Sequence, residues 1–283
     1  MKKPIIAVLI TLLLAAFACT VQNARLETID PQIVFISEPV PQNAGETELI
    51  FKMSGGKFII TPDASALIEG SIKFNVEAWK PEIIRRDNFV EIKQVNPFNV
   101  KGIPHSDVEN IWELRLTDAL PLRLSIEGGA SENIFDLTGL QLSGLNITQG
   151  ASDTTIHFDA PNPILLQEFK FTTGASSANL HGLGYANFQQ MTISCGAGDY
   201  TLDFSGGLNQ DASVDIKSGV SNITIVIPAG LKAVVHNQGA FSNVNTRGTW
   251  LVTDQTYSTL SEGYTLTINL DLSVGNINLN HEE

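Results

Sequence analysis

The chain has 283 residues, with 17 lysines and arginines against 30 aspartates and glutamates, and a formal net charge of −13. A hydrophobic share of 43% is enough to form a packed core, which excludes an intrinsically disordered chain. The acidic composition argues against nucleic-acid binding, which needs clustered cations, and two cysteines are too few for a disulfide scaffold.

Residues 1–18 have the pattern of a secretory signal peptide. Lys2 and Lys3 precede an apolar stretch, and Ala16 and Ala18 supply small residues at positions −3 and −1 of a cleavage site. The apolar stretch, residues 5–18, is shorter than the roughly 20 residues that a membrane span requires. We therefore expect residues 1–18 to be removed and the mature protein to lie outside the cytoplasm.

Cys19 directly follows the expected cleavage site, and the arrangement resembles the lipobox of bacterial lipoproteins. The resemblance implies that Cys19 is acylated, becomes the mature N-terminus and anchors the protein at a bacterial membrane or the cell surface. Ordinary cleavage, which would leave a free thiol, is the alternative. Residues 19–45 contain Pro31, Pro39 and Pro41 and few periodic apolar positions, which predicts a tether.

Residues 46–115 are expected to form an N-terminal β module. Residues 49–60 carry alternating apolar positions on both sides of a Gly-Gly pair, and residues 66–84 and 88–95 are typical of an antiparallel meander. A polar loop containing proline, residues 96–108, follows. No clean linker separates this module from the next segment, so we expect it to cap that segment.

Residues 116–283 contain a repeat of two short alternating strands separated by a small-residue turn that begins with glycine. The shortened last copy, residues 271–279, comes after an expected hairpin-like insertion around residues 250–263, and the C-terminal stretch is expected to cap the array. The turn glycines recur every 20 to 24 residues and are Gly129, Gly150, Gly174, Gly196, Gly219 and Gly239.

A recurring two-strand unit is marginal alone, but stacked copies pair their strands and share one core. The repeat therefore predicts an all-β fold, a single-stranded parallel β-helix (a β-solenoid) of about six coils. Glycine at each turn would supply either a positive φ or a close backbone approach. A β-sandwich is the rival architecture, because regularly spaced short strands fit it too. The repeated turn peptide favours the solenoid.

The segment from Trp112 to Ser152, together with GAGDYTLDFSG at residues 196–206, resembles the toast-rack family of bacterial envelope proteins. The same fold type is similar to the C-terminal domain of LiaF-like cell-wall stress proteins and to a group of adhesin-like proteins. The resemblance covers about residues 47–280 and implies that the β-helix is right-handed. It implies no catalytic residues. The chain lacks the several membrane helices of the LiaF-like type.

Side chains that bear chemistry are scattered along the repeats. His157 and His181 are about one coil apart, but their parity places them outward and favours solvent-facing histidines over a metal site. Cys195 has core parity. Three acids could come together on adjacent coils as a pair for glycoside hydrolysis, although aromatic platforms are missing. These acids are Asp199, Asp203 and Asp215.

We therefore expect no catalytic, cofactor-binding or metal-binding site. The leading hypothesis is a non-catalytic, lipid-anchored envelope protein that presents a rigid solenoid for interaction, adhesion or envelope-stress sensing. Its expected partners are the membrane, through the lipid on Cys19, and an envelope protein or a glycan. A carbohydrate-active β-helix enzyme and a subunit that stacks through its ends remain alternatives.

Overall fold

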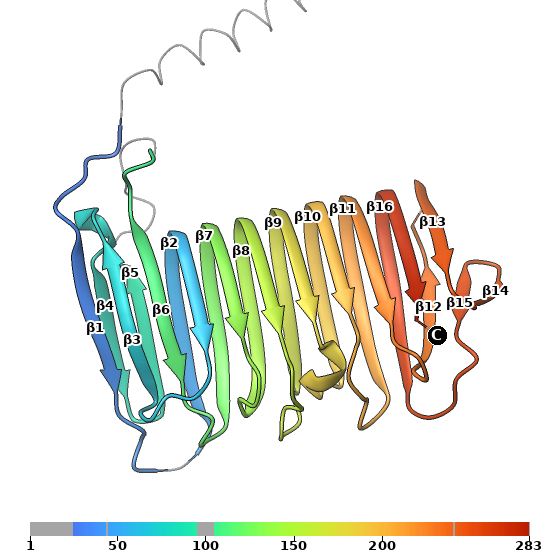
Figure 1. Cartoon of the computed structure of the whole chain (residues 1–283), viewed down its shortest axis with the longest axis horizontal. Helices are drawn as coiled ribbons and strands as arrows, with labels where there is room; N and C mark the ends of the chain where they lie inside the picture. The colour runs from blue at the N-terminus through green and yellow to red at the C-terminus, as the bar shows by residue number, and fades with distance from the viewer. Residues whose placement is uncertain (1–24, 44, 95–104, 240, 283) are drawn as a thin grey trace, which may run out of the picture.

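Sixteen strands join into one hydrogen-bonded sheet in the computed structural model, which describes residues 25–43, 45–94, 105–239 and 241–282. The main path through the sheet runs β1-β3-β6-β2-β7-β8-β9-β10-β11-β16-β12-β15-β14 (Figure 1). Strand β13 pairs with β16, while β5 pairs with β2 and β4. The described residues contain no α-helix, only the short 3-10 segments Glu77–Trp79 and Leu183–Ala186, so the all-β expectation is confirmed.

Seven long strands form the body of the sheet, and nine shorter strands lie mainly at its two ends. The long strands are β2 (Thr47–Thr61), β7 (Leu122–Asp136), β8 (Leu142–His157), β9 (Glu168–His181), β10 (Gln190–Asp203), β11 (Ala212–Ile227) and β16 (Thr265–His281). The short ones are β1 (Gln32–Glu38), β3 (Ile68–Phe74), β4 (Pro81–Arg86), β5 (Phe89–Gln94), β6 (Asn110–Leu116), β12 (Lys232–Asn237), β13 (Phe241–Arg247), β14 (Leu251–Thr253) and β15 (Thr256–Ser258).

Each long strand bends near its middle, and all seven pair in parallel with their neighbours. We call the half before the bend the N-arm and the half after it the C-arm. In β7 the buried side chains have even numbers before the bend, such as Leu124, and odd numbers after it, such as Phe135. In β2 the rings of Phe51 and Phe58, one from each arm, meet edge-to-face with centroids 5.6 Å apart. The two arms therefore form two layers with the core between them.

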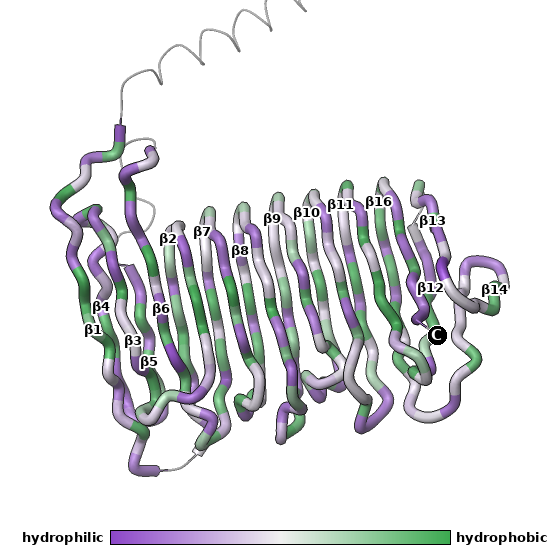
Figure 2. Tube along the Cα trace, viewed as in Figure 1, coloured by the Kyte–Doolittle hydropathy of each residue, from purple (hydrophilic) through white to green (hydrophobic). Residues whose placement is uncertain are grey.

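The core is one apolar cluster that extends along the whole array. Figure 2 shows the hydrophobic and hydrophilic residues alternating along every long strand, as period-2 strands with one buried face require. Near the N-terminal end, Phe58 contacts Trp112 and Phe135 with ring centroids 5.3 and 5.4 Å away. Such edge-to-face pairs add to the stabilisation from burial alone.

The six turn glycines lie at or beside the bends. In the structure, five of them are inside continuous strands, not in tight turns between two strands. All six have φ values outside the left-handed region, so close approach is the reason for glycine. A Cβ added at Gly174, Gly196 or Gly219 would lie 2.6 to 2.7 Å from the carbonyl oxygen of the glycine one strand earlier. Any side chain there would push adjacent strands apart.

Polar side chains fill the inside of these bends. Asn133 donates to Ser131 Oγ at 2.9 Å and to Thr154 Oγ1 at 3.0 Å, and Thr154 donates to Gln149 Oε1 at 2.7 Å. Ser152 also donates to Gln149 Oε1. Gln149 Nε2 has no partner among the described residues, but the other groups of this row bond to their own or the next strand, which offsets most of the cost of burying them.

At the N-terminal end, short strands extend both layers beyond β2. Strand β5 pairs with the N-arm of β2 and β4 pairs with β5. Strand β6 pairs with the C-arm of β2, β3 pairs with β6, and β1 pairs with β3. The C-arm layer therefore ends at β1 and the N-arm layer ends at β4.

Part of the expected tether, residues 19–45, is folded. Residues 32–38 form β1, with Ile36 and Glu38 facing inward, and the Glu38 carboxylate accepts from the Arg85 guanidinium. The prolines that suggested a tether flank this strand and do not interrupt it. The signal peptide, residues 1–18, and Cys19 lie outside the described residues, so both remain predictions.

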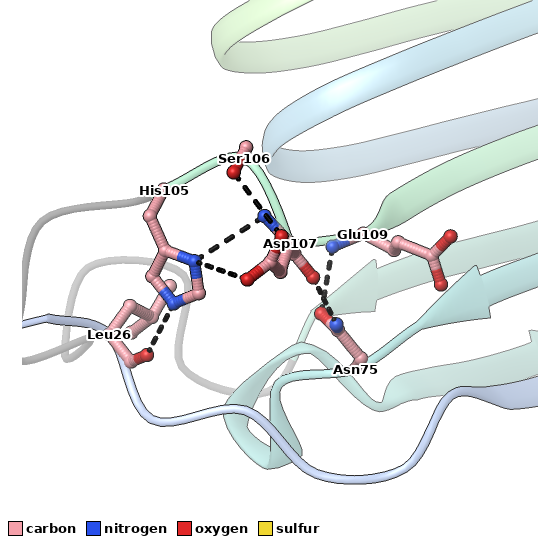
Figure 3. A network of polar contacts seen from close by, with 6 residues as sticks. All are labelled: Leu26, Asn75, His105, Ser106, Asp107 and Glu109. Atoms are coloured by element: carbon pink, nitrogen blue, oxygen red, sulfur yellow. Dashed lines mark hydrogen bonds and ion pairs between the residues drawn. The ribbon is translucent and has the colours of Figure 1, made fainter.

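A small polar network fastens the segment before β1 to the loop before β6 (Figure 3). His105 Nε2 lies 3.2 Å from the carbonyl oxygen of Leu26, while its Nδ1 accepts from the Asp107 amide at 3.3 Å. Asn75 donates to the Asp107 carbonyl oxygen at 2.6 Å and accepts from the Glu109 amide at 2.7 Å. These contacts explain why residues close to the N-terminus are ordered against the module.

The C-terminal end departs from chain order. Strand β16, which contains the copy at residues 271–279, lies between β11 on one side and β12 and β13 on the other. The expectation that this stretch caps the array is therefore wrong: β12 and β13 lie outside it. The insertion at residues 250–263 contains the β14–β15 hairpin, which pairs with the outer edge of β12.

Candidate interaction surface

The outward side of the N-arm layer carries a shallow polar depression of about 560 Å³ near the C-terminal end of the array. Strand pairing sets Thr192 beside Asp215 and Asp215 beside Asn269, so three neighbouring strands contribute one row of polar side chains. Asn269 donates to Asp215 Oδ1 at 2.8 Å, which fixes both side chains. The depression is lined by Thr192, Ser194, Asp215, Ile216, Lys217, Gln238, Asn269 and Asp271.

A second depression of about 400 Å³ adjoins the first and shares Ser194, Lys217 and Asp271 with it. Its floor includes Cys195, which is 7% exposed. Together the two depressions form a polar strip across β9, β10, β11 and β16, which we call the N-arm strip. Hydroxyls, amides and charges of both signs in one strip suit hydrogen bonding to a polar polymer or a protein surface.

Cys195 is buried as its parity predicts, and burial raises the pKa of its thiol to about 11, against hydrogen bonds with Ser218 and Tyr200 that lower it. The same site raises the pKa of Tyr200, mainly by burial. The thiol therefore stays protonated through the neutral range and lacks the electropositive setting of a reactive cysteine.

Maleimide labelling of a Cys19→Ala chain near neutral pH should consequently be slow at Cys195. We expect the folded chain to react about 100-fold more slowly than the same chain in denaturant, because its thiolate fraction is that much smaller. The rate should rise as the pH approaches the raised pKa. The measurement is mass-resolved labelling over time, and equal rates in the folded and unfolded chains would contradict the buried, protonated thiol.

The opposite face of the array, on the C-arm layer, carries a hydrogen-bonded row of amides and acids. Asn222 donates to Asp199 Oδ1 and Asn276 donates to Asn222 Oδ1, both at 2.8 Å. Two residues further along the strands, in the next row of side chains on the same face, Asn245 donates to Asn278 Oδ1 at 3.2 Å. These bonds run from strand to strand, so they hold the exposed side chains in a fixed pattern.

The register places His157 directly beside His181 on the same face. His181 Nδ1 lies 3.7 Å from Asp203 Oδ2. Within the described ranges, no group of three or more histidine, cysteine or acidic side chains has an arrangement that could hold a metal ion.

The three acids considered for glycoside hydrolysis do not converge. Asp199 and Asp203 belong to the C-arm of β10, whereas Asp215 belongs to the N-arm of β11. The core separates these two outward faces, so Asp215 cannot share a substrate with the other two. The pairing that the repeat spacing suggested is therefore wrong, because the copies bend and send their halves to opposite faces.

Two features of the array were not foreseen from the sequence. One is the positive φ of Gly198, two residues after Gly196, and of Gly275 in the shortened last copy. The other is Asn162, a buried side chain that joins three levels of the array. The double glycine in Gly196-Ala197-Gly198 was a visible signal for the first feature. Asn162 lies between two prolines and follows no repeat, so no pattern marked it.

Comparison with known proteins gives a family and a fold. The model of a family described as the N-terminal domain of toast_rack, DUF2154, matches residues 22–163 and again residues 162–226. No curated protein matches the chain.

Among solved structures, a candidate cell adhesion protein from Clostridium sporogenes is similar with a TM-score of 0.50 and 19% identity. The similarity covers 90% of this chain and 100% of that one. A candidate adhesin from Bacteroides fragilis is similar with a TM-score of 0.35 and 12% identity, over 89% of this chain and 97% of that one.

Proposed function

The chain belongs to the toast-rack family, and from this premise we propose that it is a non-catalytic, lipid-anchored protein of the bacterial cell envelope. It would present a rigid β-solenoid for interaction or adhesion. The observation that carries the proposal is the pair of broad polar faces, fixed in register on one rigid array. The similar Clostridium sporogenes protein, a candidate cell adhesion protein, supports adhesion as the role.

The solenoid part of the proposal rests on the long strands. Four consecutive connections, from β7 to β11, each lead to the next parallel neighbour, as successive coils would. Connections between parallel strands of one sheet are almost always right-handed, because strands twist that way. We therefore propose a right-handed solenoid of about six coils whose first and last long strands, β2 and β16, are flanked by short strands.

The partner proposed is a glycan or a protein of the envelope, bound at the N-arm strip. Its polar groups are spread over four strands. This favours binding along an extended partner over cleavage of one bond. None of the described residues forms a helix long and apolar enough to cross a membrane. The anchor proposed is therefore the lipid on Cys19.

Changing Cys19 to alanine tests the anchor and the interaction together. We expect the full wild-type chain to fractionate with membranes and the Cys19→Ala chain to be released, because one acylated cysteine is the only proposed link. The released chain should still sediment with purified peptidoglycan, used here as the glycan probe. Fractionation by immunoblot and co-sedimentation are the two measurements.

Cys195→Ala is the matched control, because it removes the other cysteine and should stay with the membrane. Equal release of the wild-type and Cys19→Ala chains would overturn the lipid anchor. Failure of the released chain to sediment with peptidoglycan would overturn the glycan partner and leave the anchor intact. The two parts of the proposal therefore fail separately.

A further inference from the structure

The C-arm layer ends in two free strand edges, one at each end of the molecule. At the C-terminal end, β13 pairs only with β16 within the described residues. At the N-terminal end, β3 is the one strand that pairs with β1 in the part of the chain that the structure describes. Both strands have seven residues, and Figure 1 places them at opposite ends of the array. A free edge is a template for pairing with another strand.

These two edges carry fewer of the features that usually protect an edge. In the N-arm layer, the terminal strand β14 has only three residues, and β4 begins with Pro81 and ends with Arg85 and Arg86. Short length, proline and charge are what natural sheets use to prevent edge pairing. In contrast, β1 exposes 82% of Phe35 and 54% of Ile33, and β13 exposes 78% of Phe241.

The direction of the two edges also fits. Strand β6 is parallel to the C-arm of β2, β3 is antiparallel to β6, and β1 is antiparallel to β3, so β1 runs in the direction of the array. Strand β13 is parallel to β16 and therefore runs in the same direction. A β1 strand placed beside β13 would continue the layer as one more parallel strand.

The register that the sheet itself sets brings matching side chains together. Following the pairings from strand to strand, Ser242 lies at the level of Gln32. A pairing at that level sets Val244 opposite Val34, and both are partly buried side chains packed against the core. On the outer face it brings Phe241 within diagonal reach of Ile33, a contact that stabilises paired strands.

We propose that copies of this chain associate head-to-tail, with β13 of one copy pairing with β1 of the next. Both ends of the array are also stepped, in opposite layers. Beyond β16 the N-arm layer continues for three strands and the C-arm layer for one; beyond β2 the C-arm layer continues for three strands and the N-arm layer for two. The protruding β1 of one copy would lie over the β14–β15 hairpin of the other.

Two-fold pairing of β13 with itself fits less well. Identical strands related by a two-fold axis across the sheet pair antiparallel. Both overhanging β14–β15 hairpins would then occupy the same space in the N-arm layer. The head-to-tail contact reduces the overlap to one strand, the three-residue β14 against β4 of the next copy, so β14 has to move aside. Because this contact does not close on itself, it allows short chains of molecules.

The test measures association of the full chain carrying Cys19→Ala by sedimentation velocity. We expect its average mass to rise with concentration in the micromolar range. Phe35→Lys and Phe241→Lys should each weaken association about tenfold or more, because lysine at an edge opposes pairing, and Phe241→Lys also removes the contact with Ile33. Both side chains are mostly exposed, so thermal melting should confirm unchanged folding. Val220→Lys, an exposed site on β11 and not at an edge, is the control.

Mixing the two edge variants distinguishes the geometry. The Phe35→Lys chain keeps an intact β13 and the Phe241→Lys chain keeps an intact β1, so the mixture should form dimers that grow no further. A wild-type chain that stays monomeric would overturn the proposal, as would a mixture that fails to associate. Equal weakening by Val220→Lys would also overturn it. Because every chain lacks Cys19, these outcomes are independent of the proposed anchor.

Discussion

Replacing Gly198 with alanine is expected to destabilise the fold by about 3–5 kcal/mol. Gly198 has a φ of +146°, a conformation that residues with a Cβ rarely adopt. A Cβ added there would lie 1.7 Å from the carbonyl oxygen of Ser176 on the neighbouring strand. Relief would require β9 and β10 to separate at the bend, which breaks parallel hydrogen bonds on both sides.

Gly207→Ala is the matched control. Gly207 follows β10 in a loop, has a φ outside the left-handed region, and a Cβ there would meet no heavy atom within 4 Å. We expect a change within about 0.5 kcal/mol. Urea unfolding followed by circular dichroism measures both variants. Equal unfolding midpoints for Gly198→Ala and Gly207→Ala would show that the bend tolerates a side chain, against the geometry described above.

The glycine pattern shows which parts of the bend can be predicted from the sequence. The spacing correctly marks where each repeat changes direction, because the turn peptides share one glycine position. It does not say which of two glycines carries the unusual φ. In the register, Gly198 lies beside Ser176 and Ser221, and Gly275 lies beside Ser221. Because the adjacent strands have serine at this level, glycine does not recur there from copy to copy, and the repeat pattern does not mark the position.

Parity of apolar residues was the most reliable signal, because it is local. It places Cys195 and the buried positions of every long strand on the core side. The small-residue stretch in each repeat predicts a tight turn between two strands, whereas at five of the six turn glycines the structure has an open bend within one continuous strand. A tight turn and an open bend differ in how their backbone groups are hydrogen-bonded. In this fold those bonds are made to neighbouring copies of the repeat, so the local sequence does not distinguish the two.

The glycine spacing and the apolar parity do not predict the order of the strands in the sheet. Strand β16 inserts between β11 and the later-numbered pair β12 and β13, a pairing across more than 50 residues of sequence separation. Strand β1 has only a few apolar positions between prolines, and what orders it is its pairing with β3 and the burial of Glu38 against Arg85. The position of β16 and the folding of β1 both depend on pairing with strands that are distant in sequence, which no local pattern identifies.

The same limit applies to the candidate surface. The acids looked adjacent because Asp199 and Asp203 belong to one copy of the repeat and Asp215 to the next, but the bend sends one half of each copy to each face. Residues in the same half, such as Asp215 and Asn269, meet on one strip. To predict which side chains share a face, the position of the bend must be known first. The repeat spacing then assigns each side chain to one of the two faces.

Replacing Asn162 with alanine is expected to cost about 3 kcal/mol, the second large effect. Asn162 is 2% exposed. Its side chain accepts from the Leu142 amide at 3.0 Å and donates to the carbonyl oxygens of Leu142 and Ala186 at 2.9 and 3.2 Å. Alanine would leave these backbone groups buried without partners, and the cost of an unpaired buried group exceeds the gain from forming one bond.

Asn162→Asp separates the role of the two donated bonds from that of the accepted one. A carboxylate can still accept from Leu142, but it faces two carbonyl oxygens to which it cannot donate. We expect this variant to be less stable than Asn162→Ala near neutral pH and to recover as the pH falls, because protonation restores one donor. The exposed Asn146→Ala is the control and should change stability by less than about 0.5 kcal/mol. Unfolding midpoints measured at several pH values test both, and a pH-independent Asn162→Asp would show that the donated bonds do not hold the three levels together.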